Sequence, residues 1–540
     1  MNSRPILEPL AVIRRFRNHD FTLQDFLASR VEAAPENGFV VFEGQNWTYA
    51  ETEALVDKAA RYLAVRGVRY GDRVGVFSPS HPSTIVLLFA LARLGAIMVP
   101  TNPDFGVNEA SYVFKHAEIG GLVVSPSKLD VAKQAVADLD APPWLLVNEP
   151  TGESDHEIFL TTIETGDAPA LAEPRGSADA TCLIIYTSGT SGFPKGVMHS
   201  QRAVILTGEA FVLRMYLQPS DRLMCVLPLF HINALLYSLC GSIACGGVLI
   251  LAPRFSASTF WNTAAATRAT EVNLVTTAAR ILVRRPRDEF VAEHQLRKAF
   301  IAPLTQEILD TFQKDFGVAD IIECYGMTEI PGVLSNPFVA PRKIGSLGIV
   351  SPHPDPAIAR PTTRIVDDTG RDVRPGESGE LAVRTPTIMQ GYFRAPEQTS
   401  SAFRDGWFRT GDVVYQDQEG YYFYVGRRSD MIRRRGENIS GAELDRVITD
   451  HPDVVEAAAF PVPSDMGDDD IFVAVVRRPD SKLSAQDVAA WTRHHLNAFK
   501  TPRFVAFVET LPRTPTQRIE KYKLRSDKAL IDAAIDLESR

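Results

Sequence analysis

The stretch "RVGVFSPSHPSTIVLLFALARLGAIMVP", Arg73 to Pro100, holds three apolar runs separated by short polar breaks. Residues 73–77 have the length and composition of a buried strand, residues 85–94 those of an apolar helix, and "AIMVP" those of a second strand. A strand, a helix and a strand at this spacing predict parallel strands joined by a crossover helix. The fold class is therefore expected to be α/β, with parallel-rich sheets and flanking helices.

The same alternation extends on both sides of this stretch. Upstream, Thr48 and Glu51 form a capping box, and a helical stripe follows that Gly67 is placed to end. Downstream, "TCLIIY", a helix after Ser200, "RLMCVLP" and "GGVLILA" repeat the strand and helix pattern. A large N-terminal α/β domain is expected from this repetition.

Beyond about residue 360 the pattern changes to short alternating strands, which predict an antiparallel, distorted barrel region. A first hairpin is expected to turn at residues 368–370 and 375–379. In a second, "GDVVYQDQEGYYFYVGR", the predicted turn near Gln418 and Glu419 places Asp412 beside Val425, two residues from Arg427. One carboxylate and one guanidinium should therefore share the mouth of this hairpin.

The last part of the chain indicates a separate α+β unit. It combines a helix from about Gly441, the strands "AAAFPVP" and "IFVAVVRRP", and a helix through Trp491 to Leu496. This unit of about 110 residues is long enough to fold alone. The expected organisation is an N-terminal domain over 1–426, a hinge at 427–430 and a small mobile C-terminal domain over 431–540.

Composition excludes several classes of function. The net charge of -9 argues against nucleic acid or anionic lipid as a general partner, so any polyanion must be held locally. Five cysteines without a C-x-x-C pair argue against a disulfide framework or a thiolate metal site. No apolar segment follows Arg14, Arg15 and Arg17, so no signal peptide is expected, and the predicted location is cytoplasmic.

The uncharged stretch Ile232 to Pro253 tests whether the chain spans a membrane. Gly241, Gly246 and Gly247 interrupt it, and Ser238 and Ser242 lower its hydrophobicity. A helix, a Gly-rich turn and a short strand fit these residues better than a membrane span. No membrane span is expected.

The motif "YTSGTSGFPKG", Tyr186 to Gly196, has the chemistry of a phosphate-binding loop. It contains three Gly, four Ser or Thr and one Lys, which together offer open backbone N–H groups, hydroxyls and one cation. It differs from a mononucleotide P-loop, because Lys195 is followed by Gly196 rather than Ser or Thr. Taken alone, it is equally well read as a Gly/Ser surface loop.

Five motifs together carry a family resemblance. They are "YTSGTSGFPKG", "LPLFHINAL" (227–235), "YGMTE" (325–329), "FRTGD" (408–412) and "GRRSDMIRRRGENISGAELD" (426–445). In this order they resemble the adenylate-forming superfamily of acyl-CoA synthetases, peptide-synthetase adenylation domains and luciferases. The chain looks most like the crotonobetaine/carnitine-CoA ligase group. The resemblance implies an acid–thiol ligase that uses ATP, Mg²⁺ and coenzyme A and forms an acyl-AMP intermediate from a carboxylic acid.

The resemblance also implies a role for each motif residue. Glu329 would be the Mg²⁺ ligand, Thr328 would bond the α-phosphate, Tyr325 would stack on adenine and Lys195 would assist catalysis. His231 would be the gate beside the acyl pocket. The residues implied to bind ATP or AMP are Thr187, Ser188, Gly189, Thr190, Ser191, Gly192, Ala302, Pro303, Cys324, Tyr325, Gly326, Met327, Thr328, Asp412, Tyr424 and Arg427. Those implied for the acyl pocket are His231, Asn233, Ile330, Pro331 and Gly332.

In the C-terminal part, the resemblance assigns the ribose hydroxyls to Asp412 and Arg427, the hinge to Asp430, and coenzyme A to Gly436 and Glu437. The alternative for Asp412 and Arg427 is a cross-strand pair on the protein surface. The resemblance leaves a homodimer open.

The sequence departs from the family at "LPRTPTQRIEKYKLR", where the family commonly has T-P-S-G-K-I. Arg518 stands where the adenylating Lys is usual, and arginine and lysine are not interchangeable at such a site. The main hypothesis is that Arg518 supplies this cation; other outcomes are slower adenylation, substitution by Lys521, or a lost step.

Two alternative functions remain open: a non-catalytic adenylate-binding protein, and a stand-alone adenylation enzyme that loads a carrier protein. The acid itself is not evident from the sequence. The absence of a basic residue in "LPLFHINAL" and directly after "YGMTE" disfavours a dicarboxylate, although Arg280, Arg284 and Arg285 lie nearby.

Overall fold

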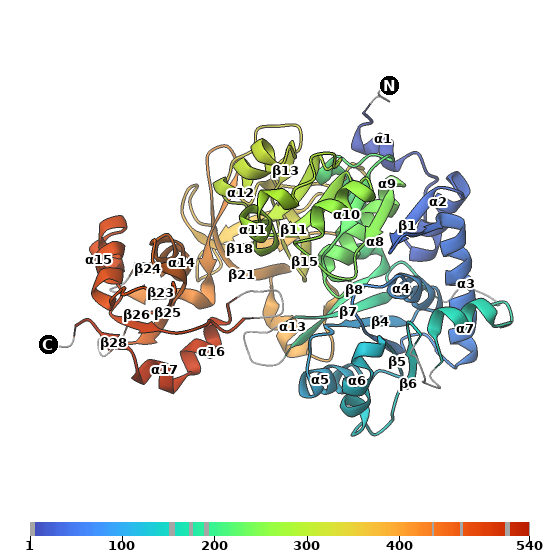
Figure 1. Cartoon of the computed structure of the whole chain (residues 1–540), viewed down its shortest axis with the longest axis horizontal. Coiled ribbons are helices and arrows are strands. Elements are labelled where there is room, and N and C mark those ends of the chain that lie inside the picture. The colour runs from blue at the N-terminus through green and yellow to red at the C-terminus, as the bar shows by residue number, and fades with distance from the viewer. Residues whose placement is uncertain are drawn as a thin grey trace. The chain divides into compact units, whose positions relative to one another are not determined.

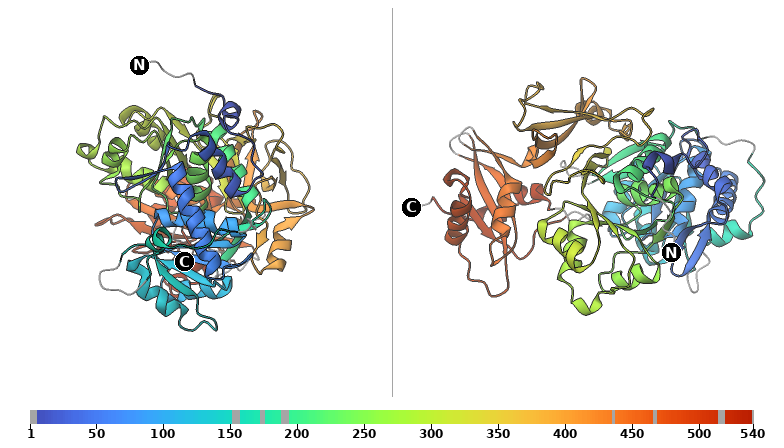
Figure 2. Two further views of the ribbon diagram at one scale, coloured as in Figure 1. Left: turned by 90° about the vertical axis from the view of Figure 1, so that its right-hand side faces the viewer. Right: turned by 90° about the horizontal axis from the view of Figure 1, so that it is seen from above.

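A computed structural model describes residues 6–150, 157–171, 176–187, 194–434, 437–464, 468–513 and 519–538, and only the backbone of Glu437 and Asn438. The chain folds into two compact units, one comprising 1–362 with 384–403 and the other 363–383 with 404–540. The elements of each unit can be followed in Figure 1 and from two further sides in Figure 2. The antiparallel strands thus group with the C-terminal unit, and the hinge expected at 427–430 stays a prediction.

The first sheet of the large unit grows out from the stretch Arg73 to Pro100. Its order is β19-β8-β7-β4-β3-β5-β6, and β3, β4, β5 and β6 run parallel. The bounds are β3 Arg73–Phe77, β4 Ile97–Thr101, β5 Gly121–Val124, β6 Trp144–Val147, β7 Thr181–Thr187, β8 Lys195–Ser200 and β19 Gly391–Tyr392. The predicted crossover helix is α4, Pro82–Leu94, and it ends at Gly95 with a left-handed φ of 69°. Every residue of α4 is buried, which explains its uninterrupted apolar sequence.

The second sheet of the large unit has the order β13-β12-β11-β9-β10-β1-β2 and is parallel except for the β1–β2 pair. The bounds are β1 Gly38–Phe42, β2 Gln45–Thr48, β9 Arg222–Cys225, β10 Val248–Leu251, β11 Glu271–Val275, β12 Lys298–Ala302 and β13 Asp320–Ile322. The helices that connect or flank the two sheets are α1 Pro9–Ile13, α2 Leu23–Ala33, α3 Tyr49–Val65, α5 Val107–Ala117, α6 Leu129–Val136, α7 Phe159–Thr165, α8 Gln201–Met215, α9 Cys240–Cys245, α10 Phe260–Ala266, α11 Thr276–Arg284 and α12 Gln306–Asp310. The capping box predicted at Thr48 and Glu51 is present at the start of α3.

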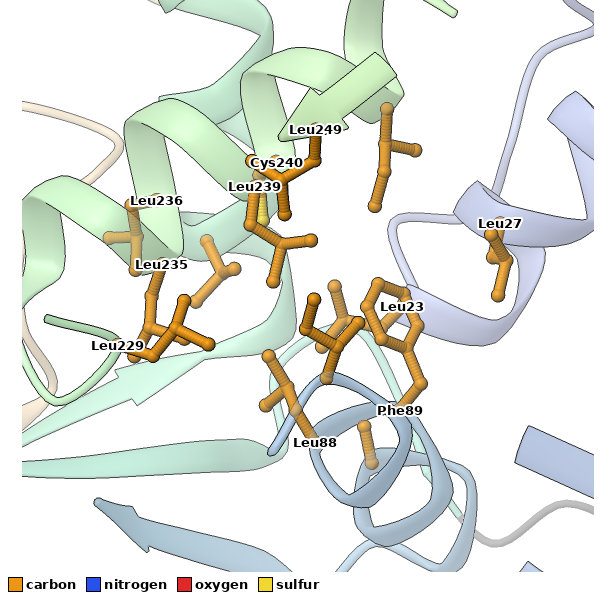
Figure 3. Packing of buried hydrophobic residues seen from close by; sticks show 14 of the residues in the cluster. Leu23, Leu27, Leu88, Phe89, Leu229, Leu235, Leu236, Leu239, Cys240 and Leu249 are labelled. Carbon is orange, nitrogen blue, oxygen red and sulfur yellow. The ribbon is translucent and has the colours of Figure 1, made fainter. Parts of the chain in front are cut away.

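One hydrophobic core joins elements of the two sheets. Side chains from α2, α4, the helical segment 233–245 and β10 pack together in it (Figure 3). This segment consists of π-helical turns over Asn233–Leu239 that continue into α9 and end at Gly246, before β10. The predicted helix, turn and strand of residues 232–253 are therefore confirmed. Among the described residues, no helix is both long enough and apolar enough to cross a lipid bilayer.

A small antiparallel sheet completes the large unit and carries the motif "YGMTE". It consists of β14 Cys324–Met327, β15 Ile330–Ser335 and β16 Ile349–Val350. Because Met327 pairs with Ile330, Thr328 and Glu329 form the two-residue turn between β14 and β15. The turn is therefore held by strands on both sides.

The second unit begins with the predicted antiparallel strands, β17 Thr362–Val366, β18 Gly379–Arg384, β20 Phe403–Arg404, β21 Trp407–Gln416 and β22 Tyr422–Arg427. Helix α13, Pro396–Ala402, precedes β20 in the sequence but belongs to the large unit. A hairpin of β23 Met431–Arg434 and β24 Glu437–Ser440 follows, then a sheet of order β25-β26-β27-β28. Its elements are α14 Gly441–Thr449, β25 Val454–Pro463, β26 Asp469–Arg477, α15 Ala485–His495, β27 Phe504–Phe507, α16 Lys521–Ser526, α17 Lys528–Asp532 and β28 Ile535–Asp536. The predicted α/β and α+β architecture is confirmed.

Candidate active site

The predicted phosphate loop connects two paired strands of the first sheet. Thr187 at the end of β7 pairs with Lys195 at the start of β8, so the loop closes a hairpin. The residues Ser188 to Gly192 lie outside the described part of the chain. The Lys195 ammonium lies 5.1 Å from the centroid of the Tyr392 ring, a cation–π contact that fixes the cation at the base of the loop.

The Thr328–Glu329 turn is tied to this hairpin through Tyr392. The Tyr392 hydroxyl donates to Glu329 Oε1 at 2.8 Å, and Glu329 is only 7% exposed. Tyr392 lies on β19 and pairs with Val197 of β8, two residues beyond Lys195. Three residues from distant parts of the sequence, Lys195, Glu329 and Tyr392, therefore converge at the base of the predicted phosphate loop. Sequence reasoning missed Tyr392, because "MQGYF" has no recognisable pattern of its own.

The backbone of the same turn is held by His199. Its Nε2 donates to the Thr328 carbonyl oxygen at 2.7 Å, and the imidazole is fully buried on β8. Burial lowers the pKa of His199 to about 4, so the ring is neutral at pH 7 and carries its proton on the donating nitrogen. A second backbone bond, from Met389 N–H to the Glu329 carbonyl at 2.8 Å, fixes the other side of the turn.

The residues expected around adenine lie on adjacent elements. Ala302 ends β12, and Pro303 follows it in the turn beside β13. Glu323 Oε1, just before Cys324 and Tyr325, accepts the N–H of Leu304 at 3.0 Å and so links that turn to β14. Burial raises the pKa of Glu323 to about 7.

The close packing of β14 against β15 explains the glycine at 326. A Cβ atom on Gly326 would overlap the backbone nitrogen of Gly332, so a glycine is required there. Tyr325 is 9% exposed, Met327 is half-buried, and Cys324 is buried with its sulfur 3.0 Å from the Ser335 hydroxyl. Cys324 therefore packs the sheet through its side chain.

The expected acyl-pocket residues come from two segments that meet at Gly332. Ile330, Pro331 and Gly332 are buried in β15, and the Gly332 backbone hydrogen-bonds the Tyr237 hydroxyl of the helical segment after His231. Burial lowers the pKa of His231 to about 4, so this ring is neutral and suits a wall or gate. Asn233 accepts a hydrogen bond at 3.0 Å from Asn273 on β11.

In the second unit, Asp412 and Arg427 pair directly. Arg427 Nε lies 2.8 Å from Asp412 Oδ1, and Asp412 is 3% exposed. The predicted register was wrong in detail: Asp412 faces Arg427 rather than Val425. The turn lies at Gln418 and Glu419 as expected, but Gln416 pairs with Tyr422, so the loop holds one residue more than a two-residue turn allows. A bulge between the Val413–Gly426 and Val414–Tyr424 pairs also leaves Val425 without a counterpart. Tyr424 is 40% exposed on the same strand.

The other C-terminal candidates are described in part. Asp430 ends a short helical turn and bonds Arg525 at 3.3 Å. Arg518, Gly436 and the side chain of Glu437 lie outside the described residues. Lys521 is 9% exposed, and its ammonium bonds Asp445 at 2.5 Å and the Ala459 carbonyl at 2.8 Å. Lys521 thus stabilises the C-terminal unit, and its replacing the usual lysine stays a prediction.

Comparisons with known proteins identify the family. A model of AMP-binding enzymes matches residues 27–393, and a model of the C-terminal domain of AMP-binding enzymes matches residues 443–518. The chain belongs to the AMP-binding enzymes. The chain is 31% identical to the sulfoacetate–CoA ligase of Cupriavidus necator, over 93% of this chain and 97% of that one. It is 29% identical to the crotonobetaine/carnitine–CoA ligase of Salmonella agona, over 89% and 93% of the two chains.

Solved structures agree with this assignment. ATP-bound MatB from Rhodopseudomonas palustris superposes with a TM-score of 0.82 at 29% identity, over 93% of this chain and 98% of that one. The ligase is accordingly an AMP-forming acid–thiol ligase. It consumes ATP, forms an acyl adenylate from a carboxylic acid, and transfers the acyl group to CoA.

Proposed function

We propose that this CoA ligase forms its acyl adenylate at the Thr328–Glu329 turn, with the triphosphate held by the loop between Thr187 and Lys195. The observation that carries the proposal is the contact of Tyr392 with both Glu329 and Lys195. These two side chains suit a metal-bound polyphosphate, since the Glu329 carboxylate would bind the metal ion and the Lys195 ammonium would bind the phosphate oxygens.

Mg²⁺ fits the residues present. Among the described residues, no group of three His, Cys, Asp or Glu side chains could enclose a metal ion. Mg²⁺ does not require one, because in nucleotide sites it is commonly held by one or two carboxylates, water and the substrate phosphates. Glu329, with one oxygen already bonded by Tyr392, would supply that carboxylate. When bound, the ion would neutralise negative charge on the phosphates.

The remaining residues would then orient the reactants. The Thr328 hydroxyl would donate to the α-phosphate, from a turn that His199 keeps in place. Tyr325 would stack on adenine, and Asp412 would accept the ribose hydroxyls while Arg427 neutralises it. Neutral His231 would separate nucleotide from acyl group. Arg518 would provide the cation that draws the acid carboxylate and the α-phosphate together.

Measuring the two half-reactions separately tests this assignment. Arg518→Ala should reduce acid-dependent pyrophosphate release by a factor of about 10² to 10³, since one contact to developing charge is lost. Thioester formation from a premade acyl adenylate should change far less. Lys521→Ala is the matched control and should keep the ratio of the two rates. Equal losses in both half-reactions of Arg518→Ala would refute the role of Arg518.

The finer resemblance to crotonobetaine/carnitine–CoA ligases stays a prediction. The ligases named for sulfoacetate and for crotonobetaine or carnitine match at 31% and 29% identity, so identity alone does not choose between them. The two kinds of acid differ in charge at the end remote from the reacting carboxylate: a sulfonate is an anion and a quaternary ammonium is a cation. The charge of the residues near Gly332, in the expected acyl pocket, therefore bears on which of these two kinds of acid binds.

A further inference from the structure

A buried arginine without a carboxylate partner lies against the expected acyl-pocket wall. Arg214, near the end of α8, is 4% exposed, and α8 packs against β15. Its Nε donates to Ser351 Oγ at 3.1 Å, and its Nη2 donates to the Gly332 carbonyl. Its third nitrogen, Nη1, has no hydrogen-bond partner in the described part of the chain. Within that part, Arg214 also forms no ion pair with an acidic side chain.

A buried, unpaired guanidinium is energetically unfavourable. Removing a charge from water costs several kcal/mol or more unless an opposite charge or enough hydrogen bonds replace the solvent. The polar side chains that act on Arg214 electrostatically are Tyr237 and Cys324, and burial raises the pKa of both, so they are neutral at pH 7. Burial lowers the pKa of Arg214 itself for the same reason. Contacts with the described residues therefore give Arg214 hydrogen bonds but no opposite charge.

Gly332 lets the Arg214 guanidinium lie directly against β15. It has a φ of 60°, and a Cβ atom at this position would overlap Arg214 Nη1. Gly332 lies three residues beyond Glu329 on β15, which at about 3.3 Å per residue is about 10 Å from the turn where we place the reacting carboxylate. The far carboxylate of malonate, succinate or glutarate lies well short of this distance, so a diacid with a longer chain is needed to reach the guanidinium from the turn.

We propose that the acid activated by this ligase carries a second anionic group, a carboxylate or a sulfonate, which binds Arg214. This inference rests on the proposed adenylation site and adds the substrate class. It reverses the expectation from sequence that a dicarboxylate is disfavoured. It also disfavours an acid with a quaternary ammonium tail, because the two cations would repel each other in a site shielded from solvent.

The test compares acids that differ only in the second charge. The wild-type ligase is assayed for pyrophosphate release with succinate, adipate and suberate, each against its monomethyl ester, and with 4-trimethylammoniobutyrate. We expect kcat/KM to be at least tenfold higher for the best doubly charged acid than for its matched monoester. A preference for the monoester or for the trimethylammonium acid would overturn the inference while leaving the adenylation site intact. Absence of pyrophosphate with every acid would instead count against the proposed function.

Variants then assign the preference to one residue. Arg214→Met should lower kcat/KM for the doubly charged acid by about 10- to 100-fold, as expected for loss of a hydrogen bond between charged groups, and change that for the monoester less than threefold. Arg202→Met, on the same helix but with a side chain that is 37% exposed, is the matched control. If Arg214→Met keeps the wild-type preference, the inference is wrong. If it does not fold, the wild-type acid panel and the more conservative Arg214→Lys, expected to keep part of the preference, decide the question.

Discussion

The Tyr392→Phe substitution tests whether Glu329 is held in place for its proposed role. It removes one hydroxyl, whose oxygen lies 2.8 Å from Glu329 Oε1, and keeps the ring that contacts Lys195. A hydrogen bond to a charged acceptor contributes roughly 1.5–3 kcal/mol, and each 1.4 kcal/mol is a factor of ten. Because Glu329 is 7% exposed, water cannot fully replace the lost donor. We expect pyrophosphate release to fall by about 10- to 100-fold.

The assay is acid-dependent pyrophosphate release with Mg²⁺ varied at fixed ATP. If Tyr392 orients Glu329 toward the metal, Tyr392→Phe should raise the Mg²⁺ concentration at half-maximal rate and leave thioester formation from premade acyl adenylate nearly unchanged. Tyr70→Phe, which alters a tyrosine that is 59% exposed, is the control and should behave as wild type. An unchanged Mg²⁺ dependence together with a wild-type rate would refute the reasoning.

Three further predictions concern charge and stability. Folding keeps the His199 pKa at about 4, below its ordinary value near 6.5, so the stability it contributes is complete above pH 6.5 and falls as the pH drops toward 4. Urea unfolding measures the free energy of unfolding at pH 7.5 and at pH 4.5. The decrease between these two values should be smaller in His199→Gln than in the wild type, by at most about 3 kcal/mol. Lys521→Met should destabilise the C-terminal unit by about 1–3 kcal/mol, because it removes the ion-pair partner of Asp445. Thermal unfolding measures this change, and a variant of wild-type stability would show that the pair contributes little. Glu323→Gln keeps a side-chain oxygen that accepts the Leu304 N–H but cannot ionise. The variant should therefore show a smaller change in the KM for ATP between pH 6 and pH 8 than the wild type. A KM that depends on pH as in the wild type would exclude Glu323 as the group responsible.

Local patterns in the sequence predicted the elements but not the contacts between distant segments. The strand, helix and strand of residues 73–100 follow from periodicity and one glycine, and all three are present. The pairing of Asp412 with Arg427 was predicted only approximately, because a bulge adds a residue that periodicity does not reveal. Tyr392 and Arg214 were missed, since each acts on a residue tens to more than a hundred positions away in the chain. Only the folded chain shows such partners.

The distribution of charge explains why these missed residues matter. The chain has a net charge of -9, yet ATP, CoA and the acid are all anions, so the molecule as a whole repels what it binds. Attraction must come from single cations held where solvent is excluded, because such charges are screened far less by salt than surface charges. Arg214 in the core meets this requirement, and Lys195, half-buried against an aromatic ring, meets it in part. If binding of the acid depends on such shielded cations, its KM should change little between low and physiological ionic strength. If a patch of surface charge attracted the acid instead, the KM would rise several-fold over the same range.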